Sequence, residues 1–409
     1  MTKSSIAMAE TEKFSANNYH PLPVVLTEGK GVWVRDVDNH RYLDMLSAYS
    51  SQNFGHCHPR IVRVLTEQAK RLAVTSRAFY TDKFAEFSKV ISNFSGMDKV
   101  LPANGGAEAV ETAIKISRKW GYESKGVEKG SAEIITCEGN FHGRTTTIIS
   151  FSTEHQNKNS FGPFAPGFRN IPFGDSGALD RSITKNTVAF LLEPIQGEGG
   201  IVIPPCGYLR EVRSICRKNN VLLVMDEIQT GMGRTGFDFA YQEEDRFGGA
   251  KPDMLILGKA LGGGMLPVSA VLADDKIMGV LRPGDHGSTF GGSPIACAVA
   301  IEAINVLREE KLSNNAKDMG RYFINRLKKI PSPLIKEVRG RGLLIGLELY
   351  PKAGGGRRFC EVALENVILC KETKENVIRF APPLTINESQ LDWSLERIKK
   401  VFRILEKEN

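Results

Sequence analysis

The feature that most constrains the fold is a series of short apolar segments that alternate with helix-compatible ones. Four such segments are bounded by turn residues and have the length of buried strands: SAEIITCEG (131–139), TVAFLLEP (187–194), VLLVMDE (221–227) and MLILG (254–258). In residues 207–219, apolar side chains recur on one face of a predicted helix: Tyr208, Leu209, Val212 and Ile215. This alternation predicts a doubly wound α/β domain with a mostly parallel sheet.

The pattern changes after about residue 298. A long apolar helix, ACAVAIEAINVLREE, is followed by EVRGRGLLIGLELY, which predicts a strand or a hairpin. A polar stretch, KAGGGRR, is expected to be an exposed loop before a closing helix. We therefore expect an N-terminal segment (1–49) that joins the small domain, a large domain (50–298) and a small α+β domain (299–409).

Composition limits the classes of partner. The chain has 409 residues, of which 41% are hydrophobic and 25% charged, as expected for a globular protein with a large core. The net charge of +7 is scattered and includes no basic block, which argues against nucleic-acid binding and suits small anionic substrates. No apolar run has the length of a membrane span, so we expect no membrane partner.

The cysteines predict neither a disulfide framework nor a metal site. No CxxC pair and no ligand-like spacing with histidine occurs among the 7 cysteines: Cys57, Cys137, Cys206, Cys216, Cys297, Cys360 and Cys370. This usage indicates a reducing compartment. The opening residues, MTKSSIAMAETEKFS, carry two glutamates and no arginine, unlike a signal or transit peptide, so we expect a cytoplasmic protein.

Polar side chains follow two of the predicted strands, at the sheet edge where ligands gather in parallel α/β folds. VLLVMDEIQTG ends its strand with Asp226 and places Gln229 in the next turn, and MLILGKALGGG ends with Lys259. An isolated ammonium beside an apolar strand is costly unless it is neutralised or used covalently. The glycines after Lys259 allow the backbone to bend closely around a group beside the amine. A cofactor aldehyde in a Schiff base would explain both features, and a lysine that reaches the surface is the alternative.

A phosphate site is expected near LPANGGAEAVETAIKISRKW (101–120). Gly105 and Gly106 precede a predicted helix whose first turn would present the backbone N–H groups of Gly106 and Ala107 to an anion. A plain glycine-containing helix start is the alternative. GMGRTG (231–236) matches GxGxxG, but it lies several residues after its strand and FDFAYQEED does not complete a βαβ unit. We therefore do not expect a dinucleotide site there.

Taken together, the longer motifs resemble those of the class III, pyridoxal-phosphate-dependent aminotransferases of fold type I, and among them the ornithine δ-aminotransferases. The match extends from NYHPLPVVL (18–26) to VIRFAPPLTI (377–386), and its specific parts are SRAFY, FHGRT, EPIQGEGG, DEIQTGMGRTG, LGKALGGGMLPVSA and HGSTFGGSP. The resemblance implies a large domain with a mixed, mostly parallel sheet and a smaller α+β domain formed by N- and C-terminal segments. It also implies transfer of the δ-amino group of L-ornithine to 2-oxoglutarate.

The resemblance implies a role for several residues toward pyridoxal 5'-phosphate. Lys259 would be the Schiff-base lysine and then the base that moves a proton. Asp226 would pair with the pyridine nitrogen and keep the ring an electron sink. Gln229 would bond the phenolic oxygen and Phe141 would stack on the ring. No metal is implied.

The same resemblance implies how the phosphate is held. Gly106 and Ala107 would bind it, while Thr289, in HGSTFGG, would reach the phosphate of the neighbouring subunit's cofactor. A homodimer with composite sites follows. Gly105 occupies a position where a hydroxyl residue is common in the family, which would remove one side-chain bond to phosphate.

Substrate choice is implied to depend on a separate set of residues. Tyr19 would bond the distant α-amino and carboxylate end of ornithine, and Tyr49 would shape the pocket toward it. Arg144 would bind a carboxylate distal from the reacting carbon. Arg379 would receive the α-carboxylate of 2-oxoglutarate or glutamate once Glu198 releases it, and bidentate arginine recognition makes this physically reasonable.

Two alternatives remain at this stage. A sister enzyme acting on N-acetylornithine or 4-aminobutyrate is disfavoured by Tyr19 and Tyr49, because an acetyl-capped amine has no use for a tyrosine directed at a charged one. A protein that binds the cofactor without turnover would need an extra partner-binding domain, or damage to Lys259 or Asp226. The stretch LCKETKEN before Arg379 lacks the threonine-histidine pair of many relatives, and a histidine, residue 142, is expected to affect pocket polarity beside Arg144.

Overall fold

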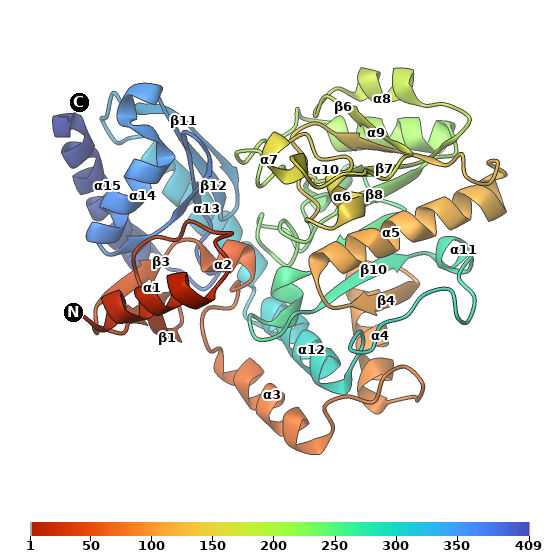
Figure 1. Ribbon diagram of the computed structural model, residues 1–409, viewed down its shortest axis with the longest axis horizontal. Helices are drawn as coiled ribbons and strands as arrows, with labels where there is room; N and C mark the ends of the chain where they lie inside the picture. Colours follow the sequence, from red (N-terminus) through yellow and green to blue (C-terminus); the bar gives the residue numbers. More distant parts are fainter. Residues whose placement is uncertain (1, 409) are drawn as a thin grey trace.

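The computed structural model describes residues 2–408 and contains a seven-stranded sheet in the order β4-β10-β9-β8-β7-β5-β6 (Figure 1). Its strands are β4 (Lys99–Ala103), β5 (Glu133–Cys137), β6 (Phe168–Ile171), β7 (Thr187–Leu192), β8 (Leu222–Asp226), β9 (Met254–Leu257) and β10 (Ser269–Ala273). The run from β9 to β6 is parallel, and β10 is antiparallel to both of its neighbours. The predicted apolar strands form β5, β7, β8 and β9, so the mostly parallel α/β sheet is confirmed.

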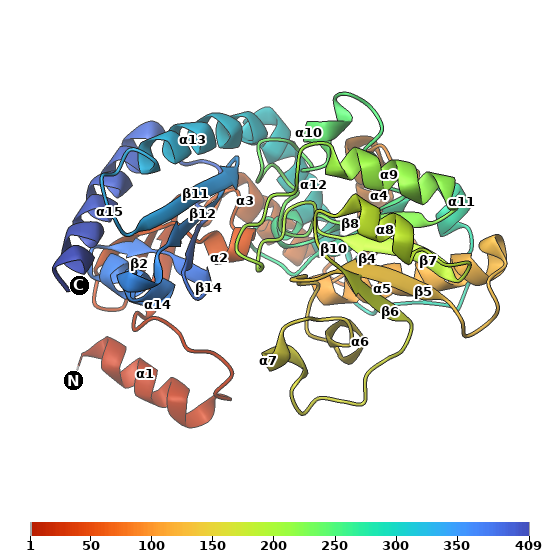
Figure 2. The same ribbon diagram turned by 90° about the horizontal axis from the view of Figure 1, so that it is seen from above.

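Helices cover both faces of this sheet because its strands are apolar on both sides. Along β8, Leu223 and Met225 belong to the core shared with α9 (Tyr208–Lys218). Val224 points the other way, into the core shared with α5 (Gly106–Trp120). Side chains alternate across a strand, so a continuous apolar run supplies two cores at once. Figure 2 shows α9 and α5 on opposite sides of the strands.

A second, four-stranded sheet forms most of a smaller domain, in the order β11-β12-β15-β14. Its strands are antiparallel: β11 (Ile335–Arg341), β12 (Leu344–Leu349), β14 (Lys371–Lys374) and β15 (Val377–Phe380). β11 and β12 form the hairpin expected from EVRGRGLLIGLELY. Three helices pack around this sheet: α13 (Leu312–Leu327), α14 (Gly355–Glu365) and α15 (Glu388–Glu408).

Two local predictions need correction. In α9, Tyr208, Leu209 and Val212 are buried as expected, but Ile215 is only half-buried and Cys216 takes its place in the core. The reason is that position 216 follows Val212 by one helical turn. KAGGGRR is not an open loop, because α14 begins within it; two glycines there, with φ of 78° and 87°, make a tight turn into the helix.

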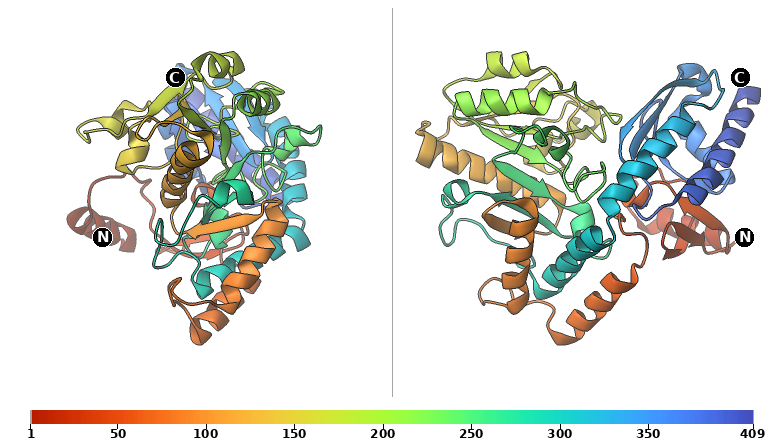
Figure 3. Two further views of the ribbon diagram at one scale, coloured as in Figure 1. Left: turned by 90° about the vertical axis from the view of Figure 1, so that its right-hand side faces the viewer. Right: turned by 180° about the vertical axis from the view of Figure 1, so that it is seen from behind.

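The N-terminal strands lie beside the small domain (Figure 3). β1 (Leu26–Lys30), β2 (Trp33–Asp36) and β3 (Arg41–Asp44) form an antiparallel series, and β13 (Ile368–Leu369) pairs parallel to β3. Segments more than 300 residues apart thus share one sheet. The first helix, α1 (Lys3–Phe14), has no buried residue and lies apart from the rest in Figure 2.

The remaining elements connect or flank these sheets: α2 (Ser47–Ser50), α3 (Pro59–Arg71), α4 (Asp82–Ser95), the π-helix η1 (Gly121–Lys125), α6 (Thr146–Ile149), α7 (His155–Lys158), α8 (Ser176–Ser182), α10 (Gln242–Asp245), the 3-10 helix η2 (Lys259–Gly262), α11 (Asp275–Met278), α12 (Pro294–Glu309) and the 3-10 helix η3 (Pro351–Ala353). Within residues 2–408, no helix combines the length and the apolar character that crossing a bilayer requires.

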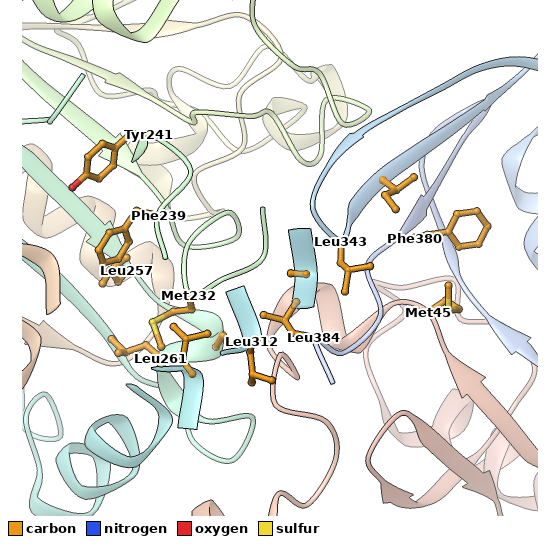
Figure 4. Close-up of a cluster of buried hydrophobic side chains, with 14 of the residues drawn as sticks. Met45, Met232, Phe239, Tyr241, Leu257, Leu261, Leu312, Leu343, Phe380 and Leu384 are labelled. Atoms are coloured by element: carbon orange, nitrogen blue, oxygen red, sulfur yellow. The ribbon is translucent and has the colours of Figure 1, made fainter. Parts of the chain in front are cut away.

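The two domains meet over a shared apolar core and a buried arginine. Figure 4 shows Met232 and Leu261 of the large domain near Leu312 and Leu384 of the small one, and all four belong to one buried cluster. Arg234, fully buried within GMGRTG, donates to the carbonyl oxygens of residue 343 (2.9 Å) and residue 382 (2.6 Å), and also to the side chains of residues 47 and 53. This glycine-rich motif therefore fastens the domains together and does not form a dinucleotide turn.

Candidate active site

A cavity of about 220 Å³ opens at the carboxyl ends of β7, β8 and β9. Seven residues that the sequence predicted for the site line it: Gly106, Ala107, Phe141, Glu198, Asp226, Gln229 and Lys259. They come from α5, from loops and from the strand ends, so the parallel sheet brings them together at one edge. His142, Gly143, Glu193, Ile195, Ile228 and Thr230 complete the lining.

Lys259 begins η2, with one residue between it and β9, and carries the amine of the cavity. Burial lowers the pKa of its ammonium to about 8, the nearby Arg379 acts in the same direction, and the Glu198 and Asp226 carboxylates oppose the shift. Its backbone has φ of 44°, a left-handed conformation that is strained for a residue with a Cβ. A neutral, nucleophilic amine is therefore accessible near neutral pH.

The glycines that follow Lys259 pack against other segments of the chain and do not line the cavity. Gly263 and Gly264 have φ of 63° and 71°, and a Cβ at Gly263 would lie 2.9 Å from the Ile61 side chain. At Gly264 it would lie 2.1 Å from the Gln52 amide oxygen. The expectation that these glycines bend around a ligand is therefore wrong: they permit a tight turn and close packing against α3 and its preceding loop.

Asp226 ends β8 and is held by two donors. Its Oδ2 lies 2.7 Å from Nδ1 of His142, and its Oδ1 accepts the backbone N–H of Ile228 at 3.0 Å. Both side chains are buried, and burial alone would lower the pKa of His142, but the bond to Asp226 raises it. Nε2 of His142 has no partner among the described residues, so the imidazole is hydrogen-bonded to Asp226 there and packs against the Phe151 ring.

The sequence did not predict this histidine–aspartate pair. His142 was expected to act beside Arg144, whereas the structure places its ring on a carboxylate 84 positions away. No local pattern contains that contact, because β8 and the loop after β5 become neighbours only in the folded sheet. The pair fixes the orientation of a buried carboxylate that faces the cavity.

Glu193 is a second residue that was missed. It follows β7 directly, and its carboxylate accepts the backbone N–H groups of Phe141 (3.0 Å) and Gly197 (3.4 Å). Burial raises the pKa of Glu193 to about 7, while His142 opposes the shift. The rule that ligands gather at strand ends could have found Glu193, since it occupies the same edge as Asp226.

An arginine from the small domain lies behind the cavity. Arg379, on β15, is 0% exposed, and its Nη1 donates to Glu198 Oε1 at 2.5 Å. Burial would raise the pKa of Glu198, but Arg379 and Lys259 together lower it. Two further guanidinium nitrogens of Arg379, Nε and Nη2, have no partner among residues 2–408. The guanidinium thus retains unused donors beside a single carboxylate.

Tyr49 packs against this ion pair from a strained turn. Its ring centroid lies 4.8 Å from the Arg379 guanidinium carbon, and its carbonyl oxygen accepts the Gln229 amide at 3.3 Å. Residues 47–50 all have positive φ, between 46° and 72°. Ser47 anchors the turn by donating to the Ala381 carbonyl oxygen at 2.6 Å. A turn of this kind costs free energy and persists only where the surroundings fix it.

Arg144 lies in an adjoining cavity of about 200 Å³, which shares Phe141 and Glu198 with the first. Its guanidinium carbon is 5.8 Å from the centre of the Phe141 ring. Four predicted site residues line neither cavity. Arg379 and Tyr49 contact the lining residues Glu198 and Gln229 from behind. Tyr19 is 77% exposed, and Thr289 is also exposed, in the loop before α12.

The groups in the cavity suit an aldehyde cofactor that carries a basic ring nitrogen and a phosphate. Lys259 supplies an amine for the aldehyde, Asp226 a buried carboxylate for a protonated nitrogen, and the start of α5 a set of free backbone N–H groups at Gly106 and Ala107. In the described part of the chain, no cluster of His, Cys, Asp or Glu could hold a metal ion.

Comparisons with known proteins agree with this geometry. The family model for aminotransferase class-III matches residues 14–402. The ornithine aminotransferase of Brevibacillus brevis is 54% identical over 406 residues, covering 99% of this chain and 100% of that one.

Solved structures are similar over the full chain. The ornithine aminotransferase from Toxoplasma gondii, with partial occupancy of PLP at its active site, superposes with a TM-score of 0.97 at 44% identity and covers 99% of this chain and 95% of its own. The acetylornithine aminotransferase from Elizabethkingia anophelis has a TM-score of 0.89 at 46% identity and covers 99% and 100%. The chain therefore belongs to the class III aminotransferases.

Proposed function

We propose that this protein transfers the δ-amino group of L-ornithine to 2-oxoglutarate with pyridoxal 5'-phosphate as its cofactor. The products are L-glutamate and glutamate 5-semialdehyde, which cyclises to pyrroline-5-carboxylate. The observation that carries the proposal is the Arg379–Glu198 pair beside the Lys259 amine. Arg379 can bind a carboxylate. Glu198 neutralises it while ornithine reacts, and it is released to bind 2-oxoglutarate. The full-length relative named ornithine aminotransferase, at 54% identity, supports the same reaction.

The residues around the cavity fit the cofactor. When bound, pyridoxal phosphate supplies an aldehyde and a ring that withdraws electrons from the substrate carbon. Lys259 would anchor the aldehyde carbon, and Asp226 would keep the ring nitrogen protonated. A contact near 4 Å at an effective dielectric of about 20 contributes on the order of 4 kcal/mol before desolvation costs. His142 orients that carboxylate by the bond at 2.7 Å.

The remaining cofactor contacts come from uncharged groups. Phe141 would cover one face of the ring, Gln229 would donate to the phenolic oxygen, and the N–H groups of Gly106 and Ala107 would hold the phosphate. Glu193 supports this arrangement by accepting the backbone N–H of Phe141 at 3.0 Å. Lys259 Nζ, whose pKa burial lowers to about 8, would be the base that takes the proton from the δ-carbon of ornithine and gives it back at the cofactor carbon.

The substrate pocket must accept an ω-amine in one half-reaction and an α-keto acid in the other. While Glu198 holds Arg379, the cavity repels an α-carboxylate, and ornithine reacts through its δ-amine. When Glu198 moves away, Arg379 binds the α-carboxylate of 2-oxoglutarate through Nε and Nη2, the two nitrogens that have no partner among the described residues. Arg144 binds the distal carboxylate, Tyr49 narrows the pocket, and Tyr19 closes over the distal end of ornithine.

We further propose that the protein acts in the cytoplasm as a homodimer, in which Thr289 reaches the cofactor phosphate of the partner subunit. Its exposure in the single chain is consistent with such a contact. Mixing a Lys259→Ala variant with a Thr289→Asp variant tests it. In the mixed dimers, one of the two sites would keep both native residues, so mixing should restore up to about half of the activity per dimer, whereas unchanged inactivity or a monomeric mass would contradict it.

The reaction is tested by a half-reaction without keto acid. Cofactor-loaded protein is mixed separately with ornithine, N-acetylornithine and 4-aminobutyrate, and the loss of the visible cofactor band is followed. Ornithine should bleach the band fastest, and o-aminobenzaldehyde should trap a pyrroline product. Faster bleaching by N-acetylornithine would instead support the activity named for the Elizabethkingia relative. A protein that binds no pyridoxal phosphate would overturn the proposal.

A further inference from the structure

An ion pair that the proposed mechanism leaves unused lies at the rim of the substrate cavity. Lys374, the last residue of β14, pairs with Glu154, which directly precedes α7. Both line the cavity of about 200 Å³ that contains Arg144 and Glu198. Figure 1 shows α7 on the side of the large domain that faces β11 and β12, so the pair bridges the two domains across the cavity. Lys374 lies in LCKETKEN, the stretch that leads to Arg379.

The pair is fixed relative to the catalytic groups. Thr373 donates its hydroxyl to the Gly197 carbonyl oxygen at 2.9 Å, which holds the end of β14 against the Glu198 segment. In the same sheet, Lys371 lies opposite Arg379. On the other side, the backbone N–H of Glu154 donates to the Ser152 hydroxyl at 3.2 Å. The two charges therefore have defined positions at the distal end of the pocket.

The pair opens at little cost. The Lys374 side chain is 40% exposed and that of Glu154 is 44% exposed, and pairs of this exposure contribute little to stability. The Arg379–Glu198 pair differs, because its arginine is fully buried. A substrate that offers opposite charges can thus replace the contact between Lys374 and Glu154.

Charge matching indicates which substrate does so. Arg144 forms no ion pair with an acid within residues 2–408, so the rim offers a free cation and a neutral pair. The distal end of ornithine bears an ammonium and a carboxylate, one charge of each sign. If the pair opens around that end, every charge regains a partner. A distal carboxylate alone, as in 2-oxoglutarate, would leave Glu154 without a partner if the pair opened around it.

We propose that Glu154 and Lys374 separate to bind the α-amino acid end of ornithine and so determine specificity for it. Glu154 accepts hydrogen bonds from the α-ammonium, and Lys374 donates to the α-carboxylate beside Arg144. This inference rests on the proposed function and adds the recognition of the α-ammonium by a carboxylate. The half-exposed site limits the gain to that of one charged hydrogen bond, or about tenfold in kcat/KM.

The test compares ornithine with 5-aminopentanoate, which has the same reacting amine and distal carboxylate but no α-ammonium. Half-reaction rates give kcat/KM for each amine with the wild-type holoenzyme and with Glu154→Gln. We expect Glu154→Gln to lower the value for ornithine about tenfold and that for 5-aminopentanoate by less than about twofold. Lys374→Met should lower both values by similar factors, since both amines carry the carboxylate.

Two controls separate recognition from support of the fold. Glu396→Gln and Lys399→Met remove a comparable exposed pair on α15, whose lysine is also 40% exposed, and should leave both rates unchanged. The exchanged variant, Glu154→Lys with Lys374→Glu, restores an ion pair with reversed polarity. This variant should regain thermal stability but not the preference for ornithine. Full recovery of the preference would show that the pair only supports the fold, and would overturn the inference.

The outcomes also distinguish this inference from the proposed function. A wild-type protein that does not convert ornithine overturns both. A wild-type preference for ornithine over 5-aminopentanoate that survives Glu154→Gln overturns the inference alone and leaves the proposed reaction intact.

Discussion

The bond between His142 and Asp226 offers a direct test of how the carboxylate is held. Replacing the histidine by leucine removes the donor 2.7 Å from Asp226 Oδ2 and leaves only the backbone N–H of Ile228. Nε2 of His142 has no partner among the described residues, so the bond to Asp226 is the side-chain hydrogen bond that the substitution removes, and leucine keeps an apolar group beside Phe151. A buried hydrogen bond to a charged group contributes about 1.5–3 kcal/mol.

If that free energy keeps Asp226 oriented toward the ring nitrogen, His142→Leu should raise the Kd for pyridoxal phosphate by about 10- to 150-fold. His142→Asn places an amide donor near the position of Nδ1 and should stay within about fivefold of the wild type. The measurement is an equilibrium titration of apoprotein with cofactor, followed by visible absorbance, together with the Tm of each apoprotein. A Kd for His142→Leu within about twofold of the wild type, at equal Tm, would show that Asp226 does not depend on this bond.

Three further outcomes follow from the site and the domain junction. Lys259→Met should stabilise the apoprotein at pH 7 by up to about 3 kcal/mol in denaturant titrations, because burial lowers the pKa of Lys259 from 10.5 to about 8. The destabilisation caused by burying the charged Lys259 is complete below pH 8 and disappears as the pH rises to 10.5. Equal stabilities of the wild type and the variant at pH 7 would contradict the lowered pKa. Gly197→Ala should weaken cofactor binding about 5- to 30-fold, because its Cβ would lie 1.6 Å from the Gln229 amide oxygen and displace that side chain. Gly105→Ala is the matched control, because a Cβ there would have no atom within 4 Å. Equal Kd values for the two variants would show that the clash with Gln229 does not affect cofactor binding. Arg234→Met should lower the free energy of unfolding by about 3–5 kcal/mol, since it strands buried acceptors at the junction, and a loss below about 1 kcal/mol would count against that role.

The sequence predicted the large sheet well because its signal is local. Strands buried on both faces must be apolar throughout, so four contiguous apolar segments sufficed to place β5, β7, β8 and β9. The same reasoning brought Asp226 and Lys259 to one edge, since parallel strands end together. The same rule applies to Glu193, which directly follows β7 at this edge.

Contacts between distant segments could not be predicted from these patterns. No spacing in the sequence reveals that His142 holds Asp226, or that Lys374 of the small domain meets Glu154 of the large one. The glycines after Lys259 suggested a ligand, yet they accommodate the side chains of neighbouring segments. A glycine in the sequence indicates only that there is little room for a side chain, and the fold determines which group occupies that space.

The sequence by itself determined the class of fold, the strand edge at which chemistry collects and, through its resemblance to a family, which residue types to seek there. Only the tertiary structure decided the electrostatics of the site. The masking of Arg379 by Glu198 and the lowered pKa of Lys259 arise because separate segments exclude water from the same small volume. Burial and charge pairing depend on distances through space, and these distances exist only after the chain has folded.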